Sequence, residues 1–99
     1  MPIAGGVAGH PWSERSIKEN APAASGVYSV FSATTWLYVG ESDDIRANLL
    51  DHLGGDIPGL AEAAPSGFSF EELGYGERTG RYAYLVKFLT PKCNKTPLV

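Results

Sequence analysis

Two tyrosines occur in paired glycine-containing tripeptides in the first half of the chain. Gly26-Val27-Tyr28 and Tyr38-Val39-Gly40 are separated by nine residues, and each lies in a short run rich in Val, Tyr, Phe, Thr and Trp, a composition that favours β-strands. A phenol hydroxyl both donates and accepts hydrogen bonds, so tyrosines on adjacent strands can serve in proton-transfer chemistry. Equally, they can be amphipathic members of the core. The residues alone leave both interpretations open.

The spacing of other reactive residues supports no second chemistry. His10, His52 and Cys93 lack the spacing of metal ligands. The glycine-rich run 5–9 follows no predicted strand and lacks the lysine of a phosphate-binding loop, and no serine lies in a nucleophile-elbow pattern. A single cysteine cannot form an internal disulfide, which favours a reducing compartment. Because no signal-peptide pattern or membrane-length apolar run is present, we expect a cytoplasmic location.

The two tyrosines are predicted to lie on an antiparallel hairpin. The β-prone runs 26–32 and 35–41 are joined by a short connector, as in a hairpin. Alternation along the second run places Trp36 and Tyr38 on one face and Leu37 and Val39 on the other. Both faces are apolar, so we expect both to be covered.

Helices and one further strand are predicted around this hairpin. Ser16 and Glu19 have capping-box spacing, which predicts one helical turn. Ser42 or Asp43 suits the N-cap of a second helix, which Gly54 ends. A short helix over 57–63, a strand over 67–73 and a last helix from Glu77 or Thr79 to Leu89 follow. The order ββαβα predicts an α+β domain with a three-stranded antiparallel or mixed sheet. We expect a flexible arm over 1–11 and a single domain over 12–99.

The same landmarks resemble the GIY-YIG nuclease superfamily. The tripeptides at 26–28 and 38–40 fall where that family has its paired tyrosine motifs, and the polar turn and helix over 41–49 are similar to the family's. His52-Leu53 matches its histidine-plus-apolar ending. Downstream, Leu85-Val86 before Pro91 and Asn94 resembles its closing pattern. The resemblance spans residues 26–94 and implies the fold already expected from the element order.

In active family members, one divalent metal held by a helix-borne glutamate promotes phosphodiester cleavage. The resemblance implies that Tyr28 and Tyr38 would position or activate the attacking water, with Mg²⁺ or Mn²⁺ as the cofactor. An arginine on the first helix after the second tyrosine would steady the phosphate, since a guanidinium matches its geometry. The resemblance adds His52 and Asn94 to the candidate binding residues.

The two charged positions of this chemistry differ here. The family arginine lies ten residues after the second tyrosine, at Asn48 in this chain. Arg46 is about 200° away around the helix, so we expect it to point elsewhere. The metal-binding glutamate falls at Tyr82, and no Asp or Glu occurs from residue 78 to residue 99. We therefore expect Tyr28, Tyr38, Asn48 and Tyr82 to form one site that holds no metal and needs no cofactor.

The charge distribution separates an acidic middle from a basic end. The net charge is −3, which does not favour nucleic-acid binding. Residues 77–95, however, carry five basic residues against Glu77 alone: Arg78, Arg81, Lys87, Lys92 and Lys95. This basic C-terminal face is the candidate contact for nucleic acid. An unidentified protein is the other candidate partner, and no membrane contact is expected.

The sequence thus favours a pseudoenzyme that binds nucleic acid or protein on a nuclease-like fold. The first alternative is a weak or unconventional metal-dependent endonuclease using Tyr28, Tyr38, Arg46 and Glu77. The second is a structural or oligomerisation domain, with candidate contacts at Trp12, Trp36 and Tyr84. The sequence does not specify the oligomeric state.

Overall fold

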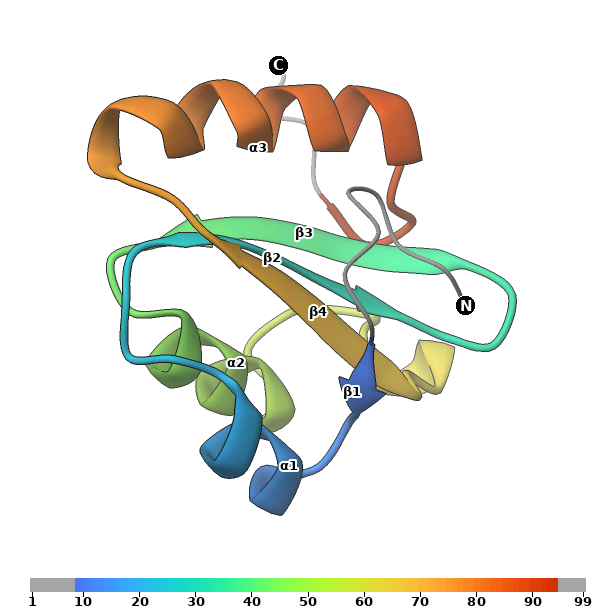
Figure 1. Ribbon diagram of the computed structural model, residues 1–99. Helices are drawn as coiled ribbons and strands as arrows, with labels where there is room; N and C mark the ends of the chain where they lie inside the picture. The colour runs from blue at the N-terminus through green and yellow to red at the C-terminus, as the bar shows by residue number, and fades with distance from the viewer. Residues whose placement is uncertain (1–8, 95–99) are drawn as a thin grey trace.

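An antiparallel sheet forms the middle layer of the molecule. The computed structural model describes residues 9–94, and its four strands lie in the order β1-β4-β2-β3 (Figure 1). Strand β2 is central, and every one of its residues is buried because both faces of the sheet are covered. The strands are β1 (His10–Pro11), β2 (Gly26–Phe31), β3 (Trp36–Ser42) and β4 (Gly67–Glu72).

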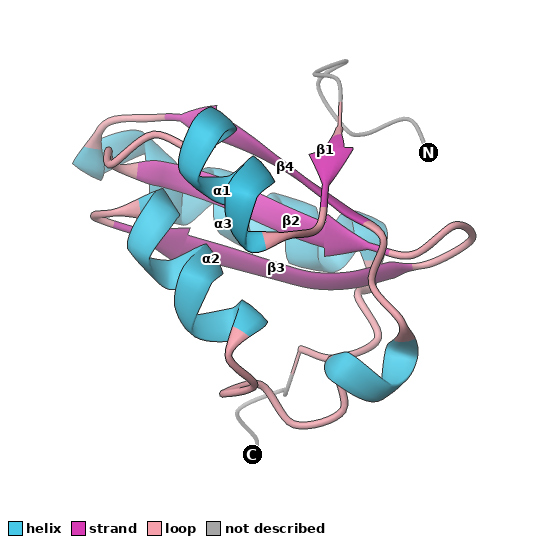
Figure 2. Ribbon diagram, turned by 90° about the horizontal axis from the view of Figure 1, so that it is seen from below, coloured by secondary structure: helices cyan, strands magenta, loops and turns pink. Residues whose placement is uncertain are grey.

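Helices cover the two faces of the sheet unequally. Helices α1 (Glu14–Asn20) and α2 (Ile45–Leu53) lie on one face, and α3 (Tyr75–Leu89) lies alone on the other (Figures 1 and 2). A short 3₁₀ turn, η2 (Ala61–Ala63), precedes β4. None of the helices in the described range is long and apolar enough to cross a membrane.

The predicted order ββαβα and the α+β class are confirmed for the three long strands and the helices between and after them. Two N-terminal expectations were wrong. His10 and Pro11, placed in the flexible arm, instead pair with Phe68 and Gly67 of β4; the rest of the predicted arm, 1–8, lies outside the described residues. Helix α1 begins earlier than expected because Ser13 caps it, accepting a hydrogen bond from the amide of Ser16 at 3.1 Å.

The segment predicted as a helix over 57–63 is mostly a turn. Only residues 61–63 are helical, as a single 3₁₀ turn. Gly59 has a φ of +84°, a left-handed conformation that interrupts a right-handed helix. Pro58 just before it supplies no amide donor.

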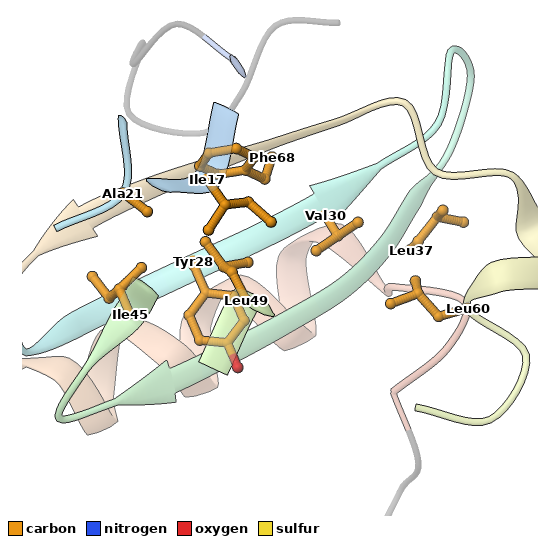
Figure 3. Close-up of a cluster of buried hydrophobic side chains, with 9 residues drawn as sticks. All are labelled: Ile17, Ala21, Tyr28, Val30, Leu37, Ile45, Leu49, Leu60 and Phe68. Atoms are coloured by element: carbon orange, nitrogen blue, oxygen red, sulfur yellow. The ribbon is translucent and has the colours of Figure 1, made fainter. Parts of the chain in front are cut away.

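The larger core lies between the sheet and helices α1 and α2. Its buried members are mostly aliphatic and include the body of Tyr28, the one residue of the cluster whose side chain carries an oxygen (Figure 3). The members are Ile17, Ala21, Tyr28, Val30, Leu37, Ile45, Leu49, Leu60 and Phe68. The core beneath α3 is smaller, with Val27, Val39 and Leu85 buried.

An irregularity in β3 changes which residues face the site. Val30 pairs with Tyr38 but Phe31 pairs with Trp36, so Leu37 is left unmatched and the register shifts. Such a bulge interrupts the two-residue alternation. Leu37 therefore packs in the α1–α2 core together with Tyr38, while Val39 packs beneath α3. The expectation that Leu37 and Val39 share a face was wrong for this reason.

Candidate functional site

Tyr28 reaches across the neighbouring strand because that strand has a glycine there. Tyr28 of β2 is paired with Gly40 of β3. A β-carbon at residue 40 would overlap the phenol ring and hydroxyl of Tyr28. The glycine that ends the second tripeptide thus opens the space through which the Tyr28 hydroxyl reaches α2. This accounts physically for the pairing of the two tripeptides.

The Tyr28 hydroxyl is hydrogen-bonded to a buried histidine. Nε2 of His52 lies 2.7 Å from it, and Nδ1 of His52 lies 2.7 Å from Oδ1 of Asp56. A carboxylate only accepts, so Nδ1 carries the hydrogen that His52 donates to Asp56. In the neutral imidazole, Nε2 is then an acceptor, and the Tyr28 hydroxyl donates to it. Tyr28, His52 and Asp56 form a relay in which each proton has an assigned place.

Asn48 and Ser42 extend this relay from the other side. The Ser42 hydroxyl donates to Oδ1 of Asn48 at 2.7 Å, and Nδ2 of Asn48 donates to the Tyr28 hydroxyl at 3.4 Å. The amide of Asp44 in turn donates to Ser42 at 2.8 Å. We call the set Ser42, Asn48, Tyr28, His52 and Asp56 the relay chain. Its buried polar side chains all have partners among the described residues.

Both tyrosines of the site hold their protons more tightly than a free phenol. Burial raises the pKa of Tyr28 well above its usual range, although the Asn48 hydrogen bond opposes the rise, and the nearby Tyr38, Asp56 and Tyr82 add to it. Burial also raises the pKa of Tyr38, with further contributions from Tyr82 and Asp56. A buried phenolate is disfavoured because it loses hydration. Both groups are therefore neutral at physiological pH.

Tyr38 lies beside the relay chain as a half-buried aromatic wall. Its ring centroid is 6.3 Å from that of Tyr28 and 5.0 Å from the His52 imidazole, which it meets edge to face. Tyr82 approaches from α3 on the opposite face of the sheet, where its ring packs on the small core. Tyr28, Tyr38, Asn48 and His52 are thus neighbours.

Three other predicted residues have separate bonds. Nε of Arg46 donates to the carbonyl of Ala21 at 2.8 Å, so the guanidinium points towards the end of α1, as expected from the helical angle. The Asn94 amide pairs with the backbone of Val39, accepting from its N–H at 2.8 Å and donating to its carbonyl at 2.9 Å. The Glu77 carboxylate accepts from the amide of Gly74 at 3.3 Å, which caps α3.

Ion pairs neutralise much of the predicted basic face. Arg78 bonds Asp43 at 2.6 Å and lies 3.4 Å from Glu41. Arg81 makes two bonds to Glu71, at 2.9 and 2.7 Å. Lys87 and Lys92 are exposed and form no ion pair with another described residue, and Lys95 lies outside the described residues.

Sequence reasoning missed Asp56 and the linking role of Ser42. Asp56 follows His52 by four residues, a spacing at which side chains meet in a helix, and this was the available signal. Ser42 was considered only as a helix cap, whereas the N-cap of α2 is Asp44.

The carboxylates around the tyrosines do not form a metal-binding group. Within residues 9–94, no cluster of three or more His, Cys, Asp and Glu side chains could hold a metal ion. Asp56 is bound to His52, and Tyr82 offers a phenol where a hard cation requires a carboxylate oxygen. The residues present therefore do not fit the single-glutamate metal site implied by the resemblance.

Comparison with solved structures identifies the fold. The chain is similar to the GIY-YIG N-terminal endonuclease domain of UvrC from Thermotoga maritima bound to magnesium, its catalytic divalent cation, with a TM-score of 0.68 and 20% identity over 80% of this chain and 96% of that one. A tyrosine-to-phenylalanine mutant of that domain matches with the same TM-score and 20% identity over 81% of this chain and 96% of that one. No family model and no curated protein matches the sequence. From the element order, the paired tyrosine strands and these matches, the chain has the fold of GIY-YIG endonuclease domains.

Proposed function

We propose that this domain does not hydrolyse phosphodiesters and acts as a binding module built on a nuclease-like fold. The observation that carries this proposal is the relay chain itself. The Tyr28 hydroxyl accepts from Asn48 and donates to His52, and it is buried. A phenol in this position has neither access to a substrate water nor a free site with which to activate one.

The protonation states of Tyr28 and Tyr38 also support the proposed loss of hydrolysis. A general base must accept a proton near the working pH. The raised pKa of Tyr28 and Tyr38 keeps both phenols protonated at neutral pH, and a neutral phenol is a poor base. The two tyrosines therefore supply no proton acceptor for water.

The missing charged groups support the proposal independently. Losing one preorganised electrostatic group typically costs about 10²–10³ in rate. Asn48 at the arginine position and Tyr82 at the glutamate position would remove both the phosphate clamp and the metal carboxylate. Such losses are not additive, but together they bring hydrolysis by the family route close to background.

A protein is the ligand class that the charges favour. Arg78 and Arg81 are committed to Asp43, Glu41 and Glu71, so they are poorly placed to neutralise phosphates. Nucleic acid is the second candidate ligand, because Lys87 and Lys92 remain exposed on the C-terminal segment.

The rival endonuclease would need Arg46 and Glu77 at the tyrosines. Their bonds to the carbonyl of Ala21 and the amide of Gly74 hold them elsewhere, which weighs against this alternative.

A plasmid-nicking assay with Mg²⁺ and with Mn²⁺ tests the proposal. We expect no cleavage above a buffer control from the unmodified chain. Metal-dependent cleavage that is abolished by Tyr38→Phe would overturn it. A gel shift at increasing salt then separates the ligand classes, because binding through phosphates weakens steeply with salt.

A further inference from the structure

The outer face of α3 exposes two aromatic side chains that stack on each other, with the Arg81 guanidinium 5.4 Å from the centroid of the Tyr84 ring. Tyr84 is 53% and Phe88 65% exposed, and their rings stack at 5.6 Å with an interplanar angle of 8°. Of the three aromatics expected to be contact residues, Trp12 packs on Phe68 and Trp36 on Phe31. Tyr84 alone of the three is mostly exposed, and Phe88 joins it.

The N-terminal half of the same face is notched by glycines. Gly76 and Gly80 lie in the helix, and a β-carbon at either would meet no atom within 4 Å. Glycine disfavours a helix interior, and nothing within the described chain requires it at these two positions. The notch therefore exposes backbone on the face that also carries Tyr84 and Phe88.

The outer face of α3 is complementary to the same face of a second copy when the two helices run antiparallel. Three pairs of residues are placed symmetrically about Tyr82 along the helix. Gly76 and Phe88 each lie six residues from Tyr82. Glu77 and Lys87 each lie five residues from it, and Gly80 and Tyr84 each lie two. At 100° per residue all six project within about 60° of the direction opposite to Tyr82, whose ring packs inward on the small core. Two α3 helices packed antiparallel about Tyr82 would set each aromatic at the level of a glycine, and each Glu77 at the level of a Lys87.

We infer that α3 is the contact surface of a two-fold symmetric homodimer. A two-fold axis makes every contact occur twice, so residue pairs mirrored about one position are what an isologous interface requires. The glycines let the helix backbones approach and receive the partner's Tyr84 and Phe88, and the Glu77–Lys87 pairs select the antiparallel orientation. This inference is independent of the proposed loss of hydrolysis, because the relay chain lies on the opposite side of the sheet.

Sedimentation velocity over a range of protein concentrations measures the association directly. We expect a reversible monomer–dimer equilibrium for the unmodified chain. Gly80→Leu should weaken it about tenfold or more, whereas the melting temperature in dilute solution should stay equal or rise, because the new side chain has open space and favours the helix. Ala47→Leu, on the exposed side of α2, is the matched control and should leave the association unchanged.

A charge exchange tests the orientation. Glu77→Lys and Lys87→Glu should each weaken the dimer by several-fold, and the double variant should restore it, which no purely local effect on α3 would do. A chain that stays monomeric at every concentration, or a Gly80→Leu variant that dimerises like the unmodified protein, would refute the inference. So would a monomer that binds single-stranded oligonucleotide through Tyr84 and Phe88, because base stacking would then explain the exposed rings.

Discussion

The Tyr28 hydroxyl and Nε2 of His52 lie 2.7 Å apart, and both side chains are buried. A tyrosine on the central strand is thereby tied to the last turn of α2, and Asp56 orients the imidazole from its other nitrogen. The bond makes both side chains part of the internal structure of the domain.

Breaking this bond should destabilise the fold. His52→Ala leaves the buried Tyr28 hydroxyl without its acceptor, at a cost of about 1–3 kcal/mol in the free energy of unfolding. In the double variant with Tyr28→Phe the hydroxyl is also absent, so the combined loss should be smaller than the sum of the single losses. Urea unfolding of the four proteins measures this coupling; strict additivity would show that the hydrogen bond contributes nothing.

Stability should fall in alkaline solution because of Tyr28. Its pKa is raised by folding, so above the unfolded value of about 10 the unfolded chain releases a proton that the folded chain retains. The contribution is therefore complete below about pH 10 and is lost as the pH rises towards the folded pKa. Unfolding measured from pH 8 upwards should show a shallower decline in Tyr28→Phe; identical slopes in the two proteins would contradict this prediction.

Replacing glycine by alanine should have opposite effects on stability at residues 40 and 80. Gly40→Ala places a β-carbon against the Tyr28 ring and should cost about 1–3 kcal/mol. Gly80→Ala meets no atom within 4 Å on α3 and should stabilise the dilute protein by up to about 1 kcal/mol. Thermal unfolding of both variants at low protein concentration provides the comparison. A Gly40→Ala variant as stable as the parent would mean that Tyr28 does not cross β3.

Introducing the glutamate and the arginine of active family members should produce metal binding before it produces hydrolysis. Tyr82→Glu supplies a carboxylate at the position where the resemblance places the metal-binding glutamate, and we expect calorimetry to detect Mn²⁺ binding that the parent lacks. Combination with Asn48→Arg should give weak nicking of plasmid, whereas each single variant stays inactive because neither group replaces the other. Tight Mn²⁺ binding by the parent, lost on Glu77→Ala, would instead favour the rival endonuclease.

The strands and helices that carry the site were predictable because their patterns are local. The tyrosine tripeptides, the apolar periodicity of α2 and the order of elements all appear within short windows of sequence. The bulge at Leu37 was not predictable, since it depends on the register between two strands. The same holds for β1, whose partner β4 is more than fifty residues away.

The neighbours of the relay chain were partly predictable and its bonds were not. The resemblance named Tyr28, Tyr38, Asn48, His52 and Tyr82 as candidate site residues, but gave no reason for Asp56. Only the folded structure shows that Asn48 joins Ser42 to Tyr28. Likewise, no partners for the basic residues of α3 were predicted from the sequence. In the structure Arg78 pairs with Glu41 of β3 and with Asp43 just after it, and Arg81 pairs with Glu71 of β4.

The contact between Asn94 and Val39 has a consequence for aggregation. Strand β3 is an edge of the sheet, and an edge with free backbone groups can add strands from other molecules. The amides of Lys92 and Cys93 bond the carbonyls of Trp36 and Leu37 at 3.0 and 2.7 Å, and the Asn94 amide imitates a peptide group opposite Val39. These three residues thus occupy backbone groups of β3 as a further strand would, which hinders the addition of strands from other molecules at this edge.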